Sequence, residues 1–560
     1  MASKRVLIVG GVAGGASCAA RLRRLDETAE IYIFERGAEV SFANCGLPYY
    51  VGGVIENRQD LLVATPERFR DLFNIEVRTR HEVRRIDRES KTIEVKNLAT
   101  GDTHEEAYDA LVLAPGAAPM RPLTEGLDLP GVFTLRNMQD VDAISHWLDH
   151  RRAQRAVVVG GGFIGLEMVE NLAHRGMEVV LLEMLDQVMA PLDHEMVVDV
   201  HQAFRDHGVE LHLSNGLKAI EPGKEDSLTV ISQKGQRFTT DAVIVSVGVR
   251  PETGLAEAAG LKIGQRGGIQ VDSRMRTSDP SIWAVGDAIE VRDVVTGQWG
   301  LCALAGPANR QGRVAAGAIS GRDDTFRGVQ GTAVVGIFGM TVAMTGASEK
   351  TLRALGLPFE KSYTFSNDHA GYYPGAEQIS MKLLFDPQTG RVLGAQAVGK
   401  AGVEKRIDVL AMAIQKEATI ADLEEAELCY APQYGSAKDP INIAGFVAGN
   451  VLRGDVELAH WDEWFARRSN GHALPMVIDV RPPEVIEELG EVPGSVKIPL
   501  SQLRRRLDQL PRDQEIWLHC NIGQTAYYAA RILAQEGFQT RNLSGGFFAY
   551  RAAAEKHDPG

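Results

Sequence analysis

The stretch Val6-Leu7-Ile8-Val9-Gly10-Gly11-Val12-Ala13-Gly14-Gly15 decides the fold of the first part of the chain. This apolar run and glycine-rich turn are followed by a helical pattern as far as Leu25, and then by a second apolar run, residues 31–34, that ends at Glu35. Glycines let a backbone approach a pyrophosphate, a helix N-terminus favours its charge, and an acid at this distance can hold a ribose diol. A tight turn in an unrelated α/β domain is the alternative, because Val12 stands at the second glycine position of GxGxxG. The residues expected to bind a dinucleotide are Gly10, Gly11, Val12, Ala13, Gly15 and Glu35.

A second unit of the same kind is more complete. The apolar run 156–159 precedes Gly160-Gly161-Gly162-Phe163-Ile164-Gly165, and a strand pattern at residues 178–182 leads to Glu183. All three glycine positions of the motif are filled, so we expect Gly160, Gly162, Gly165 and Glu183 to bind a second dinucleotide. The pattern favours NADH, because the carboxylate of Glu183 would repel a 2′-phosphate and the next two residues offer no cation for one.

A third signature, Ile282-Trp283-Ala284-Val285-Gly286-Asp287, is an apolar strand that ends in Gly-Asp. Its value lies in its position, because the first dinucleotide fold is interrupted by the second and then resumed. The segments 108–116 and 241–251 are the expected crossings between them. The predicted fold class is therefore α/β, with two nested Rossmann-like domains.

The remaining sequence adds further domains, as the length of 560 residues suggests. Residues 325–448 have an α+β pattern without a cofactor motif, which we expect to form a separate α+β domain. Residues 449–475 look irregular, and a strand pattern at residues 476–480 opens another α/β unit.

Charge and cysteine usage narrow the classes of partner. The net charge of -14 argues against nucleic acid as the main binding partner. The N-terminus lacks the apolar stretch of a signal peptide and no apolar run has membrane-spanning length, so we expect a cytoplasmic protein without a membrane partner. The spacing of the five cysteines predicts neither a disulfide framework nor a metal site, so single reactive thiols are to be sought among them, with Cys18, Cys302 and Cys429 expected to be structural. The five cysteines are Cys18, Cys45, Cys302, Cys429 and Cys520.

Together, the three signatures resemble the pyridine nucleotide–disulfide oxidoreductase superfamily over roughly residues 1–448. The resemblance implies that the first glycine loop, Glu35 and Asp287 bind FAD, with Asp287 on the ribityl chain. The second loop and Glu183 would bind NADH. Further cofactor contacts expected are Gly116, Gly248, Gly286 and Ala308.

The segment Ser41-Phe42-Ala43-Asn44-Cys45-Gly46 resembles the members with a single reactive cysteine. Two-cysteine members carry CxxxxC here, whereas this chain has Tyr50 five positions after Cys45. The single-cysteine branch includes coenzyme A-disulfide reductases, NADH oxidases and NADH peroxidases. The oxidases and peroxidases carry a histidine in the first glycine loop, where this chain has Ala13.

Two later segments, residues 369–375 and 430–440, resemble the coenzyme A branch. In that family Tyr372 and Tyr430 would reach the active site of the opposite subunit of a homodimer and assist proton transfer. The alternative is that both are core or interface tyrosines.

The C-terminal unit resembles a rhodanese domain. It carries Asp479-Val480-Arg481, the segment 490–495, and the loop Cys520-Asn521-Ile522-Gly523-Gln524-Thr525 between a strand end and a helix start. Such a loop surrounds one sulfur with backbone N–H groups and favours a thiolate. Thr525 replaces the usual arginine, which favours persulfide handling over thiosulfate chemistry.

As a whole, the chain resembles coenzyme A-disulfide reductases with a rhodanese tail and NADH-dependent persulfide or polysulfide reductases. The resemblance implies an FAD enzyme that uses NADH to reduce sulfane sulfur or disulfides at Cys45, while Cys520 transfers sulfur. A helix start beside Cys45 should lower its thiol pKa. The domains expected are 1–117 with 248–325 for FAD, 118–247 for NAD, 326–448 for dimerisation, and 449–560 for a linker and the rhodanese-like domain.

Coenzyme A carries phosphates, so a basic mouth is expected near Cys45. The candidates are Arg23, Arg24, Arg68 and Arg70, with Ser41 and Asn44 near the thiol; a solvated basic face is the alternative. Two other functions stay open, an NADH oxidase or peroxidase and a non-catalytic redox sensor for sulfur trafficking.

Overall fold

The computed structural model describes residues 3–557, which form two compact units. One unit contains the chain up to Val188 together with Gly208–Val329, and the other contains Met189–His207 together with the chain from Gln330 onward. The short segment Met189–His207 thus lies between two stretches of the first unit along the sequence but packs in the second unit. In the described residues, no helix has both the length and the apolar character needed to cross a membrane.

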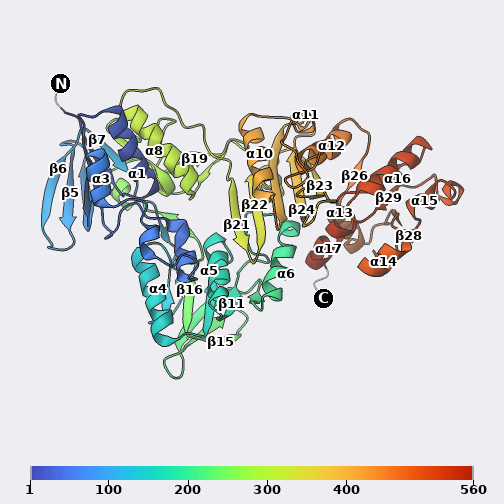
Figure 1. Cartoon of the computed structure of the whole chain (residues 1–560), viewed down its shortest axis with the longest axis horizontal. Coiled ribbons are helices and arrows are strands. Elements are labelled where there is room, and N and C mark those ends of the chain that lie inside the picture. The colour runs from blue at the N-terminus through green and yellow to red at the C-terminus, as the bar shows by residue number, and fades with distance from the viewer. Residues whose placement is uncertain (1–2, 558–560) are drawn as a thin grey trace. The chain divides into compact units, whose positions relative to one another are not determined.

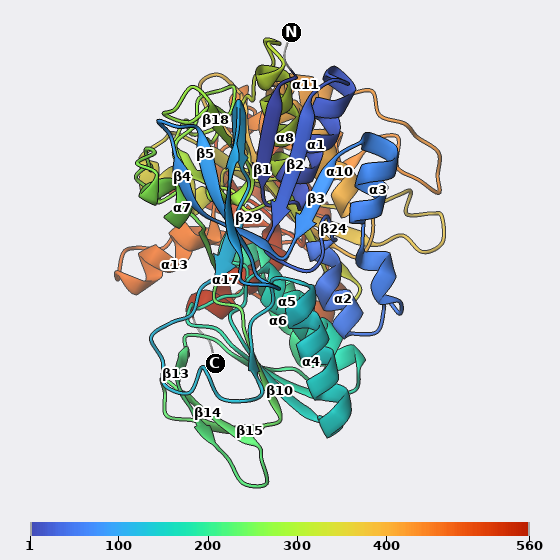
Figure 2. The same ribbon diagram turned by 90° about the vertical axis from the view of Figure 1, so that its left-hand side faces the viewer.

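The first unit begins with a parallel sheet of five strands in the order β18-β7-β1-β2-β3. Val6, Leu7 and Ile8 of β1 have no exposed surface, as expected for a parallel sheet covered on both faces. Helices α1 (Ala13–Leu25) and α8 (Ala305–Ile319) lie side by side (Figure 2). They pack so closely that a Cβ on Gly312 would lie 2.3 Å from the Gly14 carbonyl oxygen. The strands are β1 (Arg5–Val9), β2 (Glu30–Glu35), β3 (Glu76–Thr79), β7 (Ala110–Leu113) and β18 (Ile282–Ala284).

A second parallel sheet in this unit has the order β12-β11-β10-β16-β9. It interrupts the first fold, and the two crossings pair with each other as the antiparallel strands β8 (Ala117–Pro119) and β17 (Val249–Pro251). The strands of the second sheet are β9 (Val132–Phe133), β10 (Arg155–Val159), β11 (Glu178–Leu182), β12 (Glu210–His212) and β16 (Ala242–Val245).

Smaller elements complete the first unit. Two antiparallel sheets consist of β4 (His81–Asp87), β5 (Thr92–Asn97) and β6 (Thr103–Ala107), and of β13 (Leu217–Pro222), β14 (Leu228–Ser232) and β15 (Arg237–Thr240). A two-stranded sheet pairs β19 (Glu290–Arg292) with β20 (Trp299–Leu301). The remaining α-helices are α2 (Leu47–Val51), α3 (Pro66–Phe73), α4 (Met138–Arg151), α5 (Phe163–His174) and α7 (Gly254–Ala258).

The second unit contains an antiparallel sheet in the order β21-β22-β25-β24-β23, so that β23 is an edge strand (Figure 1). Its strands are β21 (Ala333–Ile337), β22 (Met340–Gly346), β23 (Glu360–Asn367), β24 (Gln378–Phe385) and β25 (Val392–Gly399). The helices of this part are α6 (Val198–Asp206), α9 (Glu349–Leu355), α10 (Val403–Gln415), α11 (Ile420–Glu424) and α12 (Pro440–Leu452).

The C-terminal part of the second unit has its own parallel sheet, in the order β26-β30-β29-β27-β28. The expectation that residues 449–475 are irregular was wrong, because α12 continues to Leu452 and a further helix, α13 (Trp461–Ser469), follows. Trp461, Trp464 and Phe465 on this helix are buried at i, i+3 and i+4, which is the spacing of a helix face. The strands are β26 (Leu458–Ala459), β27 (Met476–Asp479), β28 (Val496–Lys497), β29 (Ile516–His519) and β30 (Thr540–Leu543). The other helices are α14 (Pro483–Leu489), α15 (Leu500–Leu503), α16 (Gln524–Gln535) and α17 (Gly546–His557).

The predicted fold class is confirmed by these sheets. Two parallel sheets are nested along the chain in the first unit, and an antiparallel sheet with helices and a separate C-terminal parallel sheet follow in the second. Parallel sheets of this kind place the ends of their strands and the starts of the following helices at one edge, where ligands bind.

Candidate active sites

The first glycine loop has the backbone geometry that a bound pyrophosphate requires. Gly10 has φ +92°, and a Cβ on it would lie 2.2 Å from the Ala114 carbonyl oxygen. A Cβ on Gly15 would lie 1.9 Å from the Gly10 carbonyl oxygen. Helix α1 begins at Ala13 without a side-chain cap at Val12 and without an acid in its first turn. A helix N-terminus without such a protein acceptor is suited to bind an anion.

The two acids predicted to hold a ribose take equivalent positions. Glu35 accepts hydrogen bonds from the Gly11 N–H (3.0 Å) and the Gly37 N–H (2.8 Å). Glu183 accepts from the Gly161 N–H (2.6 Å) and the Leu185 N–H (2.7 Å). Each carboxylate therefore sits at the end of a second strand and against its own glycine loop, as a dinucleotide ribose requires.

The second glycine loop repeats the first. Gly160 has φ +106° and lies against the Ser246 carbonyl oxygen, which a Cβ would approach to 2.5 Å. Gly165 packs as Gly15 does, with a Cβ position 1.9 Å from the Gly160 carbonyl oxygen. Gly162, which precedes α5, has no atom within 4 Å of its Cβ position, so this part of the loop faces open space. The residues present fit a dinucleotide at each loop.

The other predicted cofactor contacts lie around the first sheet. Asp287 follows β18 and loses water on burial, which raises its carboxyl pKa while the Arg136 guanidinium opposes that rise. The Gly286 N–H donates to Gln311 Oε1 (2.7 Å), and Ala308 is buried on α8. Gly116 (φ +73°) and Gly248 (φ +111°) precede the crossing strands β8 and β17.

Cys45 lies in the 3-10 helix η1 (Asn44–Gly46) and has exposed surface. The expected lowering of its pKa is not what the protein groups produce. Partial removal from water raises the pKa of the Cys45 thiol, and the carboxylates of Glu167 and Asp287 raise it further. The helix that follows Cys45, α2, has only 5 residues, so its dipole is weak against two nearby negative charges. The interaction with Asp287 also relates Cys45 to the predicted FAD site.

Tyr49 and Glu167 were missed by the sequence reasoning. Tyr49 donates a hydrogen bond from its hydroxyl to Glu167 Oε1 (3.2 Å), between α2 and α5. Burial raises the pKa of Glu167 to about 7, although the hydrogen bond from Tyr49 opposes this. Burial, with Glu167 nearby, raises the pKa of Tyr49 to about 12. Cys45 therefore has beside it a carboxyl group that changes charge near neutral pH.

The side chains expected to form a basic mouth differ in their surroundings. Arg24, Arg68 and Arg70 are exposed, although Arg70 forms an ion pair with Asp71 (3.1 Å). Arg23 is buried and donates to the backbone carbonyls of Phe73, Asn74, Asp26 and Glu27, so it is a structural link between α1 and the end of α3.

Ser41 and Asn44 flank the reactive segment in different ways. Ser41 is buried with φ +51°, and its N–H donates to the Gly11 carbonyl (2.9 Å), which ties the Cys45 segment to the first glycine loop. Asn44 is exposed, and its Nδ2 donates to the Arg136 carbonyl (3.5 Å).

Tyr372 and Tyr430 come together in the second unit. Their hydroxyl oxygens are 3.0 Å apart, and both rings are exposed, Tyr372 to 76% and Tyr430 to 49%. The hydrogen bond with Tyr430 raises the pKa of Tyr372. Two exposed, hydrogen-bonded tyrosines are suited to donate a proton to a partner outside this unit.

Cys520 directly follows strand β29 and lies in the loop that precedes α16. It is only 3% exposed, and its Sγ accepts a hydrogen bond from the Gly523 N–H (3.2 Å). Arg481 lies buried near this loop, with hydrogen bonds to Asp479 (2.6 Å) and Asn521 Oδ1 (3.3 Å). The loop therefore offers a donor to the sulfur and is braced by a buried ion pair.

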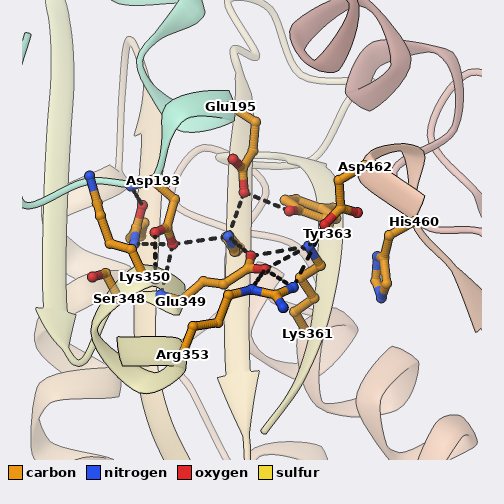
Figure 3. A network of polar contacts seen from close by, with 12 residues as sticks. Asp193, Glu195, Ser348, Glu349, Lys350, Arg353, Lys361, Tyr363, His460 and Asp462 are labelled. Atoms are coloured by element: carbon orange, nitrogen blue, oxygen red, sulfur yellow. Dashed lines mark hydrogen bonds and ion pairs between the residues drawn. The ribbon is translucent and has the colours of Figure 1, made fainter. Parts of the chain in front are cut away.

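One group of acids among the described residues has the spacing of metal ligands, namely Asp193, Glu195 and Glu349, whose ligand atoms lie within 4.8 Å of one another. Figure 3 shows these three acids directed toward a common point, and their ion pairs place the Lys382 ammonium among them. Lys382 Nζ is 2.9 Å from Asp193 Oδ2 and 2.5 Å from Glu349 Oε2, and it also bonds to Glu195. We therefore describe this group as a buried ion-pair cluster.

Comparison with known proteins places this geometry in a family. Residues 4–312 match the family described as pyridine nucleotide-disulphide oxidoreductase, residues 332–439 match its dimerisation domain, and residues 462–553 match the rhodanese-like domain. The coenzyme A disulfide reductase of Staphylococcus haemolyticus is 37% identical over 449 residues, which cover 80% of this chain and 100% of that protein.

Two solved structures are similar over almost the full length. Reduced Bacillus anthracis CoADR-RHD is 46% identical, with a TM-score of 0.96 and coverage of 100% of this chain and 99% of that chain. An NAD-dependent persulfide reductase from A. fulgidus is 39% identical, with a TM-score of 0.89 and coverage of 98% and 100%. The chain therefore belongs to the pyridine nucleotide-disulphide oxidoreductase family, as an enzyme with a dimerisation domain and a C-terminal rhodanese-like domain.

Proposed function

We propose that this enzyme uses NADH to reduce sulfur–sulfur bonds in persulfides, polysulfides and coenzyme A disulfide, with Cys45 as the reacting thiol. Cys520 accepts and passes on sulfane sulfur. The observation that carries this proposal is that the chain has two free cysteines in different structural environments. Cys45 is exposed and interacts with Asp287 of the predicted FAD site, whereas Cys520 is held in a loop that donates an N–H to sulfur. The similarity to a coenzyme A disulfide reductase and to an NAD-dependent persulfide reductase supports the substrate class.

Members of this family use FAD and NAD(H), which together supply hydride and electron-pair transfer. The chain's own glycine loops bind the pyrophosphates, and Glu35 and Glu183 orient the riboses. Ser41 holds the Cys45 segment to the first loop through its bond to Gly11. The protein thereby fixes the thiol next to the site at which electrons arrive.

The Cys45 thiolate attacks the sulfane sulfur of a persulfide RSSH. The sulfur–sulfur bond of RSSH breaks, RS⁻ leaves, and Cys45 carries the transferred sulfur as a persulfide. Two electrons then break that new bond, which releases HS⁻ and restores the Cys45 thiolate. The sum is RSSH + NADH → RSH + HS⁻ + NAD⁺, and for a disulfide RSSR + NADH + H⁺ → 2 RSH + NAD⁺.

Proton supply comes from groups of this chain. Glu167, with its pKa of about 7, holds a proton near Cys45 below neutral pH and releases it above. Tyr372 and Tyr430 protonate the leaving thiolate in the other subunit of a homodimer, which the match to the dimerisation domain supports. The exposed Arg24, Arg68 and Arg70 attract the phosphates of coenzyme A.

The test is anaerobic NADH oxidation with sulfide release measured, in variants of single cysteines. Cys45→Ser should abolish turnover of every acceptor, because the attacking sulfur is lost. Cys520→Ser should spare reduction of a small artificial disulfide but impair polysulfide turnover. Cys429→Ser, which removes another exposed thiol, is the matched control and should behave as the parent enzyme. Retained turnover in Cys45→Ser would argue for a different reaction, as would rapid oxygen consumption without any sulfur acceptor in a separate aerobic assay.

A further inference from the structure

The edge strand β23 of the dimerisation domain is covered by the rhodanese-like domain. An uncovered edge strand leaves backbone groups without partners, and proteins cover such edges. Here the Tyr363 N–H donates to Ser544 Oγ (3.1 Å), and the rings of Phe365 and Phe548 meet edge to face at 5.4 Å. Lys361 Nζ reaches Asp462 Oδ2 at the start of α13 (3.2 Å). These three contacts join the rhodanese-like domain to β23 of the dimerisation domain.

Gly545 shows how close this contact is. It has φ +74°, and a Cβ on it would lie 3.0 Å from the Tyr363 Cβ and 2.6 Å from the Ala549 Cβ. A side chain at this position would be strained by the positive φ and would meet Ala549 within the same segment and Tyr363 on β23, so the segment 544–549 or Tyr363 would have to shift. Glycine therefore permits the close approach of this segment to β23.

The same short segment also forms backbone hydrogen bonds to the Cys520 loop. The Phe547 N–H donates to the Cys520 carbonyl (2.7 Å), and the Phe548 N–H donates to the Asn521 carbonyl (3.1 Å). A Cβ on Gly546 would lie 2.3 Å from the Cys520 carbonyl oxygen. Trp461 Nε1 donates to the Gly546 carbonyl (2.7 Å), which joins the start of α13 to the same point. The backbone of the sulfur-carrying loop is thus set by residues that also rest on β23.

Tyr363 is fixed on its other side by the buried ion-pair cluster shown in Figure 3. Its hydroxyl donates to Glu195 Oε1 (2.6 Å), and Glu195 is bonded to Lys382, which has no exposed surface. Burial raises the pKa of Tyr363 well above its ordinary value, so the hydroxyl remains a donor at all moderate pH values. Buried charged groups with several partners allow little movement of the side chains they bind.

We propose that Tyr363 is a positioning residue for Cys520: through Ser544, Gly545 and Gly546 the dimerisation domain sets the geometry of the loop that carries sulfur. The inference rests on the proposed function of Cys520 and deepens it. It assigns to the dimerisation domain a role in sulfur transfer, in which the rhodanese-like domain presents Cys520 from a fixed orientation.

The experiment compares the holoenzyme with Gly545→Ala, which separates the contact, and Tyr363→Phe, which removes only the hydroxyl. Gly471→Ala is the matched control, because Gly471 also has positive φ (+67°) but no atom within 4 Å of its Cβ position. Three quantities are measured: polysulfide turnover, reduction of a small artificial disulfide, and the pH profile of iodoacetamide alkylation of Cys520.

Gly545→Ala should lower polysulfide turnover by about tenfold, because a displacement of the order of an ångström is costly for a reacting group. Tyr363→Phe should lower it in the same direction. Both variants should displace the pH profile of Cys520 alkylation and leave disulfide reduction as in the parent. Gly471→Ala should leave all three quantities as in the parent. A change in general stability alone would not move the alkylation profile.

Unchanged Cys520 alkylation in both variants would overturn the inference, whatever happens to turnover. If Gly545→Ala does not fold, the Tyr363→Phe profile decides. The proposed function fails separately, when Cys520→Ser leaves polysulfide turnover intact.

Discussion

At the proposed reducing site, the residue Glu167 influences the pKa of the Cys45 thiol. A cysteine beside a flavin would react fastest if its surroundings favoured the thiolate. In this chain the nearest protein groups do the reverse, since burial and two carboxylates raise the Cys45 pKa. One of these carboxylates, Glu167, has a pKa of about 7, so its influence on Cys45 changes within the neutral range.

Replacement of Glu167 by Gln should therefore make Cys45 more reactive. Above pH 7 the parent carboxylate is charged and disfavours the thiolate, whereas below pH 7 it is protonated and the effect fades. Glu167→Gln should raise the rate of Cys45 alkylation by up to about tenfold, mainly on the alkaline side, because one pKa unit corresponds to a tenfold change in thiolate fraction. The rate is measured by mass spectrometry of the Cys45 peptide. Glu178→Gln, which removes an exposed carboxylate on β11, is the control, and equal rates in all three proteins would contradict the argument.

The sequence predicted the glycine loops and their acids because each requires a residue type that few alternatives replace. Gly10 and Gly160 have positive φ and lie against a carbonyl oxygen, so any other residue type at either position would be strained and would clash. Tyr49 and Glu167 could not be found in this way. A glutamate in an amphipathic helix is usually solvated, and only the packing of α5 on α2 places it by the thiol.

At the scale of elements, the sequence predicted strands and helices well where their periodicity was local. It did not predict that Met189–His207 packs with the second unit, because its partners lie far along the chain. Lysine side chains such as those of Lys361 and Lys382 are almost never buried inside a protein unless they form ion pairs. Their carboxylate partners come from that segment, from α9 and from α13, so no single stretch of sequence reveals the cluster.

Loss of the central cation of this cluster should destabilise the second unit. Although burial alone would raise the pKa of Glu195, Lys382 and its hydrogen bonds lower it to about 2 from an ordinary 4.5. Lys382→Met removes the shared partner of Asp193, Glu195 and Glu349, of which Asp193 and Glu349 are buried, and should cost about 3–5 kcal/mol at neutral pH. The deficit should shrink as the pH falls, beginning above the ordinary 4.5, because burial without this cation raises the pKa of the carboxyl groups and they take up protons.

Hydrogen exchange of peptides from β23 and β24 measures this deficit within the unit concerned. Lys416→Met, on the exposed surface after α10, is the control for loss of a lysine charge. Equal protection of β23 in Lys382→Met and the parent would show that the cluster contributes nothing to stability.

At the scale of the molecule, two thiols lie on one chain but in units of different construction. The covalent link keeps the effective concentration of one thiol high for the other, whichever carrier moves between them. The first unit contains the predicted cofactor sites and Cys45, and the second contains Cys520 and the tyrosine pair. Tyr372 and Tyr430 are exposed on their own unit, which is the state expected of residues that complete a site in another copy.

Mixed dimers test this assignment directly. Neither Cys45→Ser nor the double variant Tyr372→Phe, Tyr430→Phe should support full turnover alone. In a dimer that contains one subunit of each, the intact Cys45 faces the intact tyrosines of the other subunit, so one site is competent. Subunit exchange should therefore restore coenzyme A disulfide or persulfide reduction above the level of either variant. If the tyrosines acted within their own subunit, the remaining Cys45 would still meet phenylalanine, and mixing would restore nothing.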